Sequence, residues 1–187
     1  MNTNKEIVAL EAGQIDPEQP EEILFIGSRT NLLAYDVNNN SDIFDYEITD
    51  GLNCLGFGTI QGTADKLIIA GGNCSITGLD KMAEERYWTV TGDNAQAIGF
   101  VDWDEDGQDE LVVGSDDFAI RVFKGEELVF DINEEAKVRA IKCIQDNIWG
   151  YALENGSYGV YYTRKRLWTQ KQKQKVTAIT FTDFPEE

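Results

Sequence analysis

The feature that most constrains this chain is an internal repeat. A small residue followed by an aliphatic one returns at intervals of 45, 43, 43 and 38 residues, as Ala9-Leu10, Cys54-Leu55, Ala97-Ile98, Ala140-Ile141 and Ala178-Ile179. Repeats of about 40 residues are typical of arrays in which each unit buries its apolar face against its neighbours. Because a four-stranded propeller blade has this length, the repeat predicts an all-β propeller.

Each predicted unit contains four strand-like segments in the same order. The first surrounds the small-aliphatic pair, and the second is a short apolar run that closes on Gly27, Gly71 or Gly114 in three of the four units. The third follows after a hairpin-length loop, and the fourth alternates around a central aromatic side chain. The predicted blades are approximately residues 4–50, 51–93, 94–134 and 135–175, with 176–187 as the first strand of a further blade.

Residues 134–144 are the one segment for which two structures compete. They are rich in helix formers, so propensity alone predicts a helix. However, Ala140-Ile141 lies in phase with Ala97-Ile98, and propensity is weak evidence against a recurring register. The repeat therefore predicts a first strand here.

Composition narrows the function. The 187 residues include no histidine, which excludes Ser-His-Asp and Cys-His nucleophile systems and histidine-ligated metals, so we expect no enzyme. A net charge of -18 disfavours nucleic acid and anionic lipid and favours basic protein faces or cations as partners. Three cysteines without a C-x-x-C spacing, and the lack of a leader or long apolar run, lead us to expect a reduced, intracellular protein that does not enter membranes.

A carboxylate motif lies between the first and second strands of the third unit. Asp102, Asp104 and Asp106 can surround one hard cation, Gln108 can offer its backbone carbonyl, and Glu110 can close the shell. The spacing predicts one bound calcium ion in a loop between strands. The alternative is a solvated acidic turn without an ion.

Six of the sixteen basic side chains lie within twelve residues near the end of the sequence. They are Arg164, Lys165, Arg166, Lys171, Lys173 and Lys175. One interpretation is an exposed edge strand that lysines protect from pairing with other chains. The other is a docking patch for an acidic partner.

Several blocks resemble the amino-terminal propeller of the Bardet-Biedl syndrome protein 2 family. They lie at residues 30–42, 68–73, 87–94, 102–124 and 151–161. The resemblance implies a seven-bladed ring followed by coiled-coil and further domains. It also implies a subunit of the BBSome, the coat-like complex that carries membrane proteins into and out of cilia, in the cytoplasm, the cilium and the ciliary base or basal body. The implied partners are other BBSome subunits with propeller or coiled-coil domains, and contact with membrane is indirect.

Together these observations predict about four WD40-like or FG-GAP-like blades of a seven-bladed ring, in a non-catalytic scaffold. The 102–110 loop is similar to the calcium loops of integrin-type FG-GAP blades, so a calcium-dependent ligand-recognition propeller is the alternative function. A second such loop, which the family resemblance would place near residues 182–185, is absent from the sequence. Because four blades leave two end faces uncovered, we expect the chain alone to self-associate or to be marginally stable.

Overall fold

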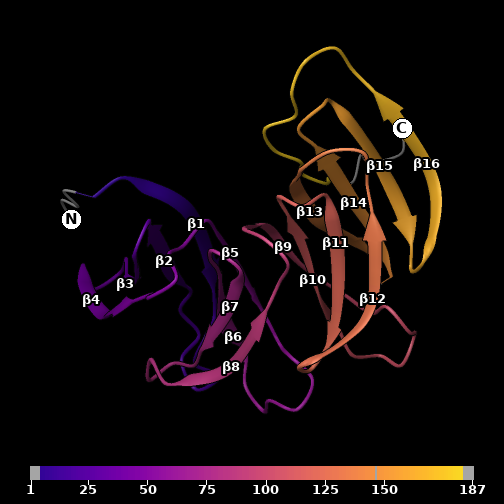
Figure 1. The fold of residues 1–187 in the computed structure, drawn as a ribbon. Helices are drawn as coiled ribbons and strands as arrows, with labels where there is room; N and C mark the ends of the chain where they lie inside the picture. The colour runs from indigo at the N-terminus through magenta and orange to yellow at the C-terminus, as the bar shows by residue number, and fades with distance from the viewer. Residues whose placement is uncertain (1–4, 146, 183–187) are drawn as a thin grey trace, which may run out of the picture.

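A computed structural model describes residues 5–145 and 147–182, which form four antiparallel sheets of four strands each (Figure 1). Blade 1 consists of β1 (Ile7–Gly13), β2 (Ile23–Ser28), β3 (Asn31–Asp36) and β4 (Ser41–Glu47). Blade 2 consists of β5 (Cys54–Gly58), β6 (Leu67–Gly71), β7 (Ser75–Leu79) and β8 (Glu85–Val90). Blade 3 consists of β9 (Ala95–Val101), β10 (Glu110–Ser115), β11 (Ala119–Lys124) and β12 (Glu127–Asn133). Blade 4 consists of β13 (Val138–Gln145), β14 (Ile148–Leu153), β15 (Ser157–Tyr162) and β16 (Lys165–Lys171).

The all-β prediction is confirmed, and each sheet lies within one of the four predicted units. The segment with helix propensity forms β13, and Val138 and Ile141 are both buried against blade 3. These residues are three apart, and a β-bulge at Arg139 brings both to the same face of the strand. No helix in the part of the chain that the structure describes could cross a bilayer.

The sequence predicts the first strand of a further blade at residues 176–187. The described residues 176–182 form no strand, so the prediction is wrong there, and residues 183–187 lie outside the described residues. A first strand pairs with the second strand of its own blade, as β1 pairs with β2. All sixteen strands among the described residues belong to the four blades, so the structure shows no second strand with which the backbone near Ala178 could form a ladder.

The first strands β1, β5, β9 and β13 lie at the centre of the arc, and β4, β8, β12 and β16 lie at its rim (Figure 1). Glycine allows the central strands to approach. A Cβ atom added to Gly99 would lie 2.7 Å from Cγ2 of Ile141 on the next blade, and one added to Gly56 would lie 2.3 Å from Cγ2 of Ile98. Since carbon atoms pack at about 3.5–4.0 Å, only glycine fits at these two positions without displacing its neighbour.

Three apolar clusters fill the spaces between neighbouring blades. Phe25 packs in the cluster between blades 1 and 2, and Ile69 in the cluster between blades 2 and 3. The cluster between blades 3 and 4 is aromatic, with the Trp149 ring stacked on Tyr161 at a centroid distance of 4.5 Å and close to Trp103 at 6.2 Å. Each blade therefore buries its apolar surface against the next, as the repeat predicts.

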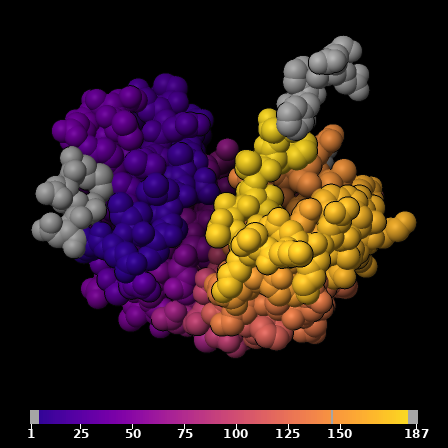
Figure 2. Space-filling model, turned by 90° about the horizontal axis from the view of Figure 1, so that it is seen from above, coloured from indigo at the N-terminus to yellow at the C-terminus, as the bar shows by residue number. Residues whose placement is uncertain are grey.

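The four blades form an open arc rather than a closed ring (Figure 2). Leu10 occupies the position in β1 that Ile98 and Ile141 occupy in their blades. Ile98 and Ile141 are buried against the preceding blade, whereas Leu10 is 60% exposed because the described part of the chain places no blade before it. The end faces of the arc are thus interblade surfaces without a neighbour.

Candidate functional site

The acidic loop connects the end of β9 to the start of β10 and is closed by its own backbone. The carboxylate of Asp102 accepts hydrogen bonds from the amides of Asp106 and Gly107, both at 3.0 Å. The Gln108 amide donates to Asp106 Oδ1 at 2.9 Å. Gly107 has a positive φ of 84°, a conformation that glycine adopts at no steric cost. The loop is therefore a defined turn and not a strand extension.

The carboxylates of Asp102, Asp104 and Asp106 come together as the sequence predicts. One oxygen of each lies within 4.8 Å of the others. The ammonium group of Lys124, at the end of β11, lies beside this cluster. It contacts Asp104, lies 2.8 Å from Asp106 Oδ2 and lies 3.7 Å from Glu110 Oε1.

These contacts shift the ionisation of both partners. The carboxylates of Asp104 and Asp106 raise the pKa of Lys124, and its ammonium group lowers the pKa of Asp106. The lysine therefore supplies one positive charge to the loop without any metal. Sequence reasoning missed this residue, because nothing in the spacing links position 124 to the 102–110 motif.

Glu110 is the buried member of the cluster, with 1% of its surface exposed. Its Oε2 atom accepts a hydrogen bond from the Trp103 amide at 2.8 Å, whereas Oε1 has no hydrogen-bond donor within the described structure. Burial raises the pKa of this carboxyl. These carboxylates suit calcium, which prefers several carboxylate oxygens as ligands. The Lys124 ammonium already contacts oxygens of the same carboxylates, so a calcium ion would have to displace it or bind beside it. Calcium binding therefore stays a prediction.

The six basic residues lie along the rim of blade 4 and divide into two groups. Three of them pair with glutamates: Arg166 contacts Glu134, Lys171 lies 3.4 Å from Glu135, and Lys175 lies 3.1 Å from Glu154. The other three form no ion pair with any residue the structure describes; they are Arg164, Lys165 and Lys173. The predicted patch is thus only half free for a partner.

A polar cavity of about 490 Å³ lies where the end of β12 meets the outer half of blade 4. The Arg166 guanidinium stacks over the Tyr161 ring at 5.2 Å and, with the Tyr161 hydroxyl, contacts Glu134. Hydrogen bonds from Ser157 and Asn155, together with Lys171, lower the pKa of Glu135 to about 2. Every charged group named here already has a partner, so the cavity has the features of a structural network.

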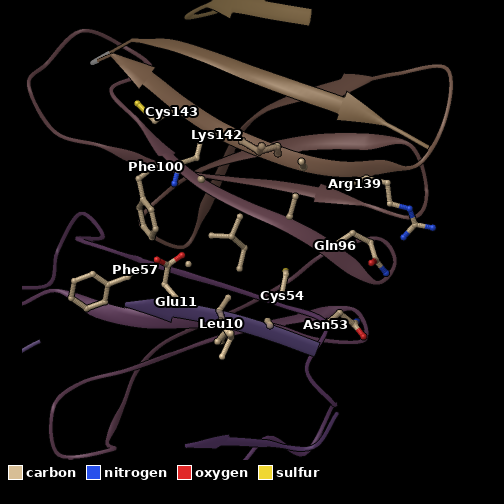
Figure 3. Close-up of a pocket in the computed structure, with 18 of the residues that line it drawn as sticks. Leu10, Glu11, Asn53, Cys54, Phe57, Gln96, Phe100, Arg139, Lys142 and Cys143 are labelled. Carbon is tan, nitrogen blue, oxygen red and sulfur yellow. The ribbon is translucent and has the colours of Figure 1, made fainter. Parts of the chain in front are cut away.

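Sequence reasoning also missed a groove of about 480 Å³ that the four first strands line (Figure 3). Asn53, Gln96 and Arg139 lie at one end of it, at positions that repeat every 43 residues just before the small-aliphatic pair. That spacing could have revealed them. Phe57 and Phe100 lie toward the other end (Figure 3). The groove is the inner wall of the arc. Its labelled side chains do not place a nucleophile beside a general base, the arrangement that covalent catalysis needs.

Comparison with protein families identifies two matching regions. The model for the ciliary BBSome complex subunit 2, N-terminal region, matches residues 1–58, and the model for its middle region matches residues 97–187. The BBSome complex member BBS2 of Rattus norvegicus is 43% identical over 184 residues, which is 98% of this chain and 26% of the relative. The protein of the same name from Homo sapiens is 42% identical over the same shares of both chains. The chain therefore spans about a quarter of the length of these relatives.

Solved structures with the same fold are propellers. The crystal structure of BBS1N in complex with ARL6DN matches with a TM-score of 0.73 at 12% identity, over 96% of this chain and 55% of that one. The WD40 propeller domain of Doa1 matches with a TM-score of 0.69 at 12% identity, over 90% of this chain and 55% of that one. These similarities confirm the predicted propeller fold. The two family models and the relatives, which agree along almost the whole sequence, show that this chain belongs to the ciliary BBSome complex subunit 2 family.

Proposed function

We propose that this chain acts as a propeller portion of a BBSome subunit and serves as a non-catalytic scaffold. In this proposal it packs against other propeller or coiled-coil subunits while the complex carries membrane proteins to and from cilia. It would act in the cytoplasm, the cilium and the ciliary base, and would meet the membrane only through the complex.

The observation that carries the proposal is the extent of the similarity. Identity of 42% to 43% runs over 98% of the chain, and the same residues form four complete blades. The similar structure of BBS1N, which is a complex with ARL6DN, supports a protein-binding role for a propeller of this kind. The lack of histidine supports a non-catalytic role, since the commonest general base of enzymes is missing.

The test is assembly. The tagged chain is co-expressed with the other subunits of the complex, purified through the tag and separated by size-exclusion chromatography, with and without a calcium chelator. We expect the chain to elute with other subunits under both conditions. Elution of the chain by itself, with the subunits in separate fractions, would contradict the scaffold role.

The alternative is a calcium-dependent recognition propeller, and one observation favours it. Three loop carboxylates lie within 4.8 Å of one another, and the buried Glu110 Oε1 beside them lacks a hydrogen-bond donor in the described structure. The chelator separates the two functions. Loss of a partner from the complex on calcium removal would support recognition through the loop, whereas an unchanged complex supports the scaffold.

A further inference from the structure

The four rim strands carry different charges. β4 has three acidic side chains and no basic one, and β12 has two acidic side chains and no basic one. β8 is balanced, with one of each sign. β16 has three basic side chains and no acidic one. In a chain of net charge -18, this strand is the one cationic rim among the four sheets that the structure describes.

β16 is also the most exposed rim strand. All seven of its residues are exposed, whereas β4, β8 and β12 each have two residues that are buried or half-buried. Leu167 and Trp168 in the middle of β16 are 49% and 47% exposed. The Trp168 ring meets Tyr158 edge-on at 6.1 Å, which fixes its position. An apolar centre with cations at both ends is the composition of a recognition surface, in which the aromatic residue supplies contact area.

The ion pairs decide which cations can meet a partner. Arg166 and Lys171 are engaged by glutamates of the loop after β12, which leaves Arg164 and Lys165 at one end of the strand and Lys173 beyond the other. These three have no carboxylate partner among the described residues. Burying these three cations in an interface costs free energy unless negative charges of the partner pair with them.

The backbone of β16 does not favour pairing with an added strand. The register with β15 shifts at Leu167, which is left unpaired as a β-bulge. The other rim strands bulge at the equivalent points, including Val129 in β12. Because bulges interrupt the ladder at sheet edges, a partner must be recognised by side chains.

We propose that the cationic rim, defined as Arg164, Lys165, Leu167, Trp168 and Lys173, docks an acidic segment of another protein subunit. Carboxylates of the segment meet the three free cations, and an apolar side chain covers Trp168 and Leu167. The inference rests on the proposed scaffold function and gives the chemistry of one partner surface. A protein segment fits better than a lipid surface, because the molecule carries a net charge of -18 and an anionic bilayer repels it as a whole.

Two measurements test the proposal. In the co-expressed complex, a photo-crosslinking amino acid replaces Leu167, and the matched control replaces Val129 at the equivalent bulge of the acidic β12. We expect a cross-link at 167 to an acidic peptide of another subunit, and loss of it when Arg164, Lys165 and Lys173 are all changed to Glu. The variant Glu126→Lys with Glu127→Lys reverses charge beside β12 and should leave the cross-link intact.

The second measurement needs no other subunit. Fluorescence anisotropy follows binding of a short labelled peptide of alternating glutamate and leucine to the chain itself. The triple charge reversal should weaken binding by about tenfold or more, because three attractions become repulsions. Equal binding of the peptide by both proteins would overturn the proposal, as would equal cross-linking at 167 and 129, or a cross-link at 167 to lipid alone. Failure of the chain to join any subunit contradicts the scaffold function, while the anisotropy result still decides the rim chemistry.

Discussion

Replacing Gly99 by alanine tests how the blades pack. The new methyl group would lie 2.7 Å from Cγ2 of Ile141, whereas carbon atoms pack at about 3.5–4.0 Å, so one strand must move by about 1 Å. Ile141 cannot turn away freely, because it is 6% exposed and also lies against Gly114. The expected response is therefore a shift of β9 against β13.

The free energy of unfolding should fall. Overpacking of a well-filled interior costs about 1–3 kcal/mol. Alanine also lowers the conformational entropy of the unfolded chain relative to glycine, which stabilises the folded state by about 0.4–1 kcal/mol. The net expectation for Gly99→Ala is a loss of about 1–2 kcal/mol, measured by urea denaturation followed by tryptophan fluorescence.

A matched glycine and a second substitution control the experiment. A Cβ atom added to Gly150 would have its nearest neighbours at 3.7 Å, which is ordinary contact, so Gly150→Ala should be neutral or slightly stabilising. Ile141→Ala alone should cost about 2–5 kcal/mol, and in the double variant the two losses should fall short of additivity by about 1–3 kcal/mol. Equal stability of Gly99→Ala and Gly150→Ala, or strict additivity with Ile141→Ala, would refute the close approach of these blades.

Three further outcomes follow from the same structure. Calorimetry should detect one bound calcium ion with a dissociation constant on the order of 10⁻⁴ M. The variant Lys124→Met should bind calcium about tenfold more tightly, because the competing ammonium group is gone. No heat of binding from either protein at millimolar calcium would exclude the site. The pKa of Glu135 is about 2 in the folded protein against 4.5 for the free side chain, so its stabilisation is present above pH 4.5 and lost as the pH falls toward 2. Glu135→Gln should flatten the pH dependence of the melting temperature in that window, and an unchanged profile would contradict the assigned pairing. Light scattering should show self-association of the chain alone, because no blade among the described residues covers either end face of the arc. A monodisperse monomer that unfolds cooperatively would oppose this expectation.

The fold was predictable because the repeat carries more information than local propensity. The phase of Ala140-Ile141 identifies β13 despite its helix-forming residues, since burial of Val138 and Ile141 against blade 3 outweighs a weak intrinsic preference. The repeat failed near Ala178, where the small-aliphatic pair recurs but the described residues 176–182 form no strand and meet none that pairs with them. A repeated pattern specifies a strand only when its ladder partner is present.

The candidate site was predictable in its acidic half alone. The spacing of Asp102, Asp104 and Asp106 brought them together as expected, because they share one short loop. Lys124 was missed because it is distant from Glu110 in the sequence. Glu110 begins β10 and Lys124 ends β11, and the antiparallel pairing of these two strands brings the two residues together. The partners of the basic run were missed for the same reason, since Glu134 precedes Arg166 by 32 residues. Long-range ion pairs of this kind leave no periodic signal.

The measurement that tests the central claim most directly is quantitative affinity purification of the tagged chain from ciliated cells, followed by mass spectrometry of what it retains. A propeller portion of a BBSome subunit should retain other subunits of that complex in fixed proportion and above their level with an untagged control. Recovery of the chain with none of them, from cells in which the complex is intact, would contradict the account.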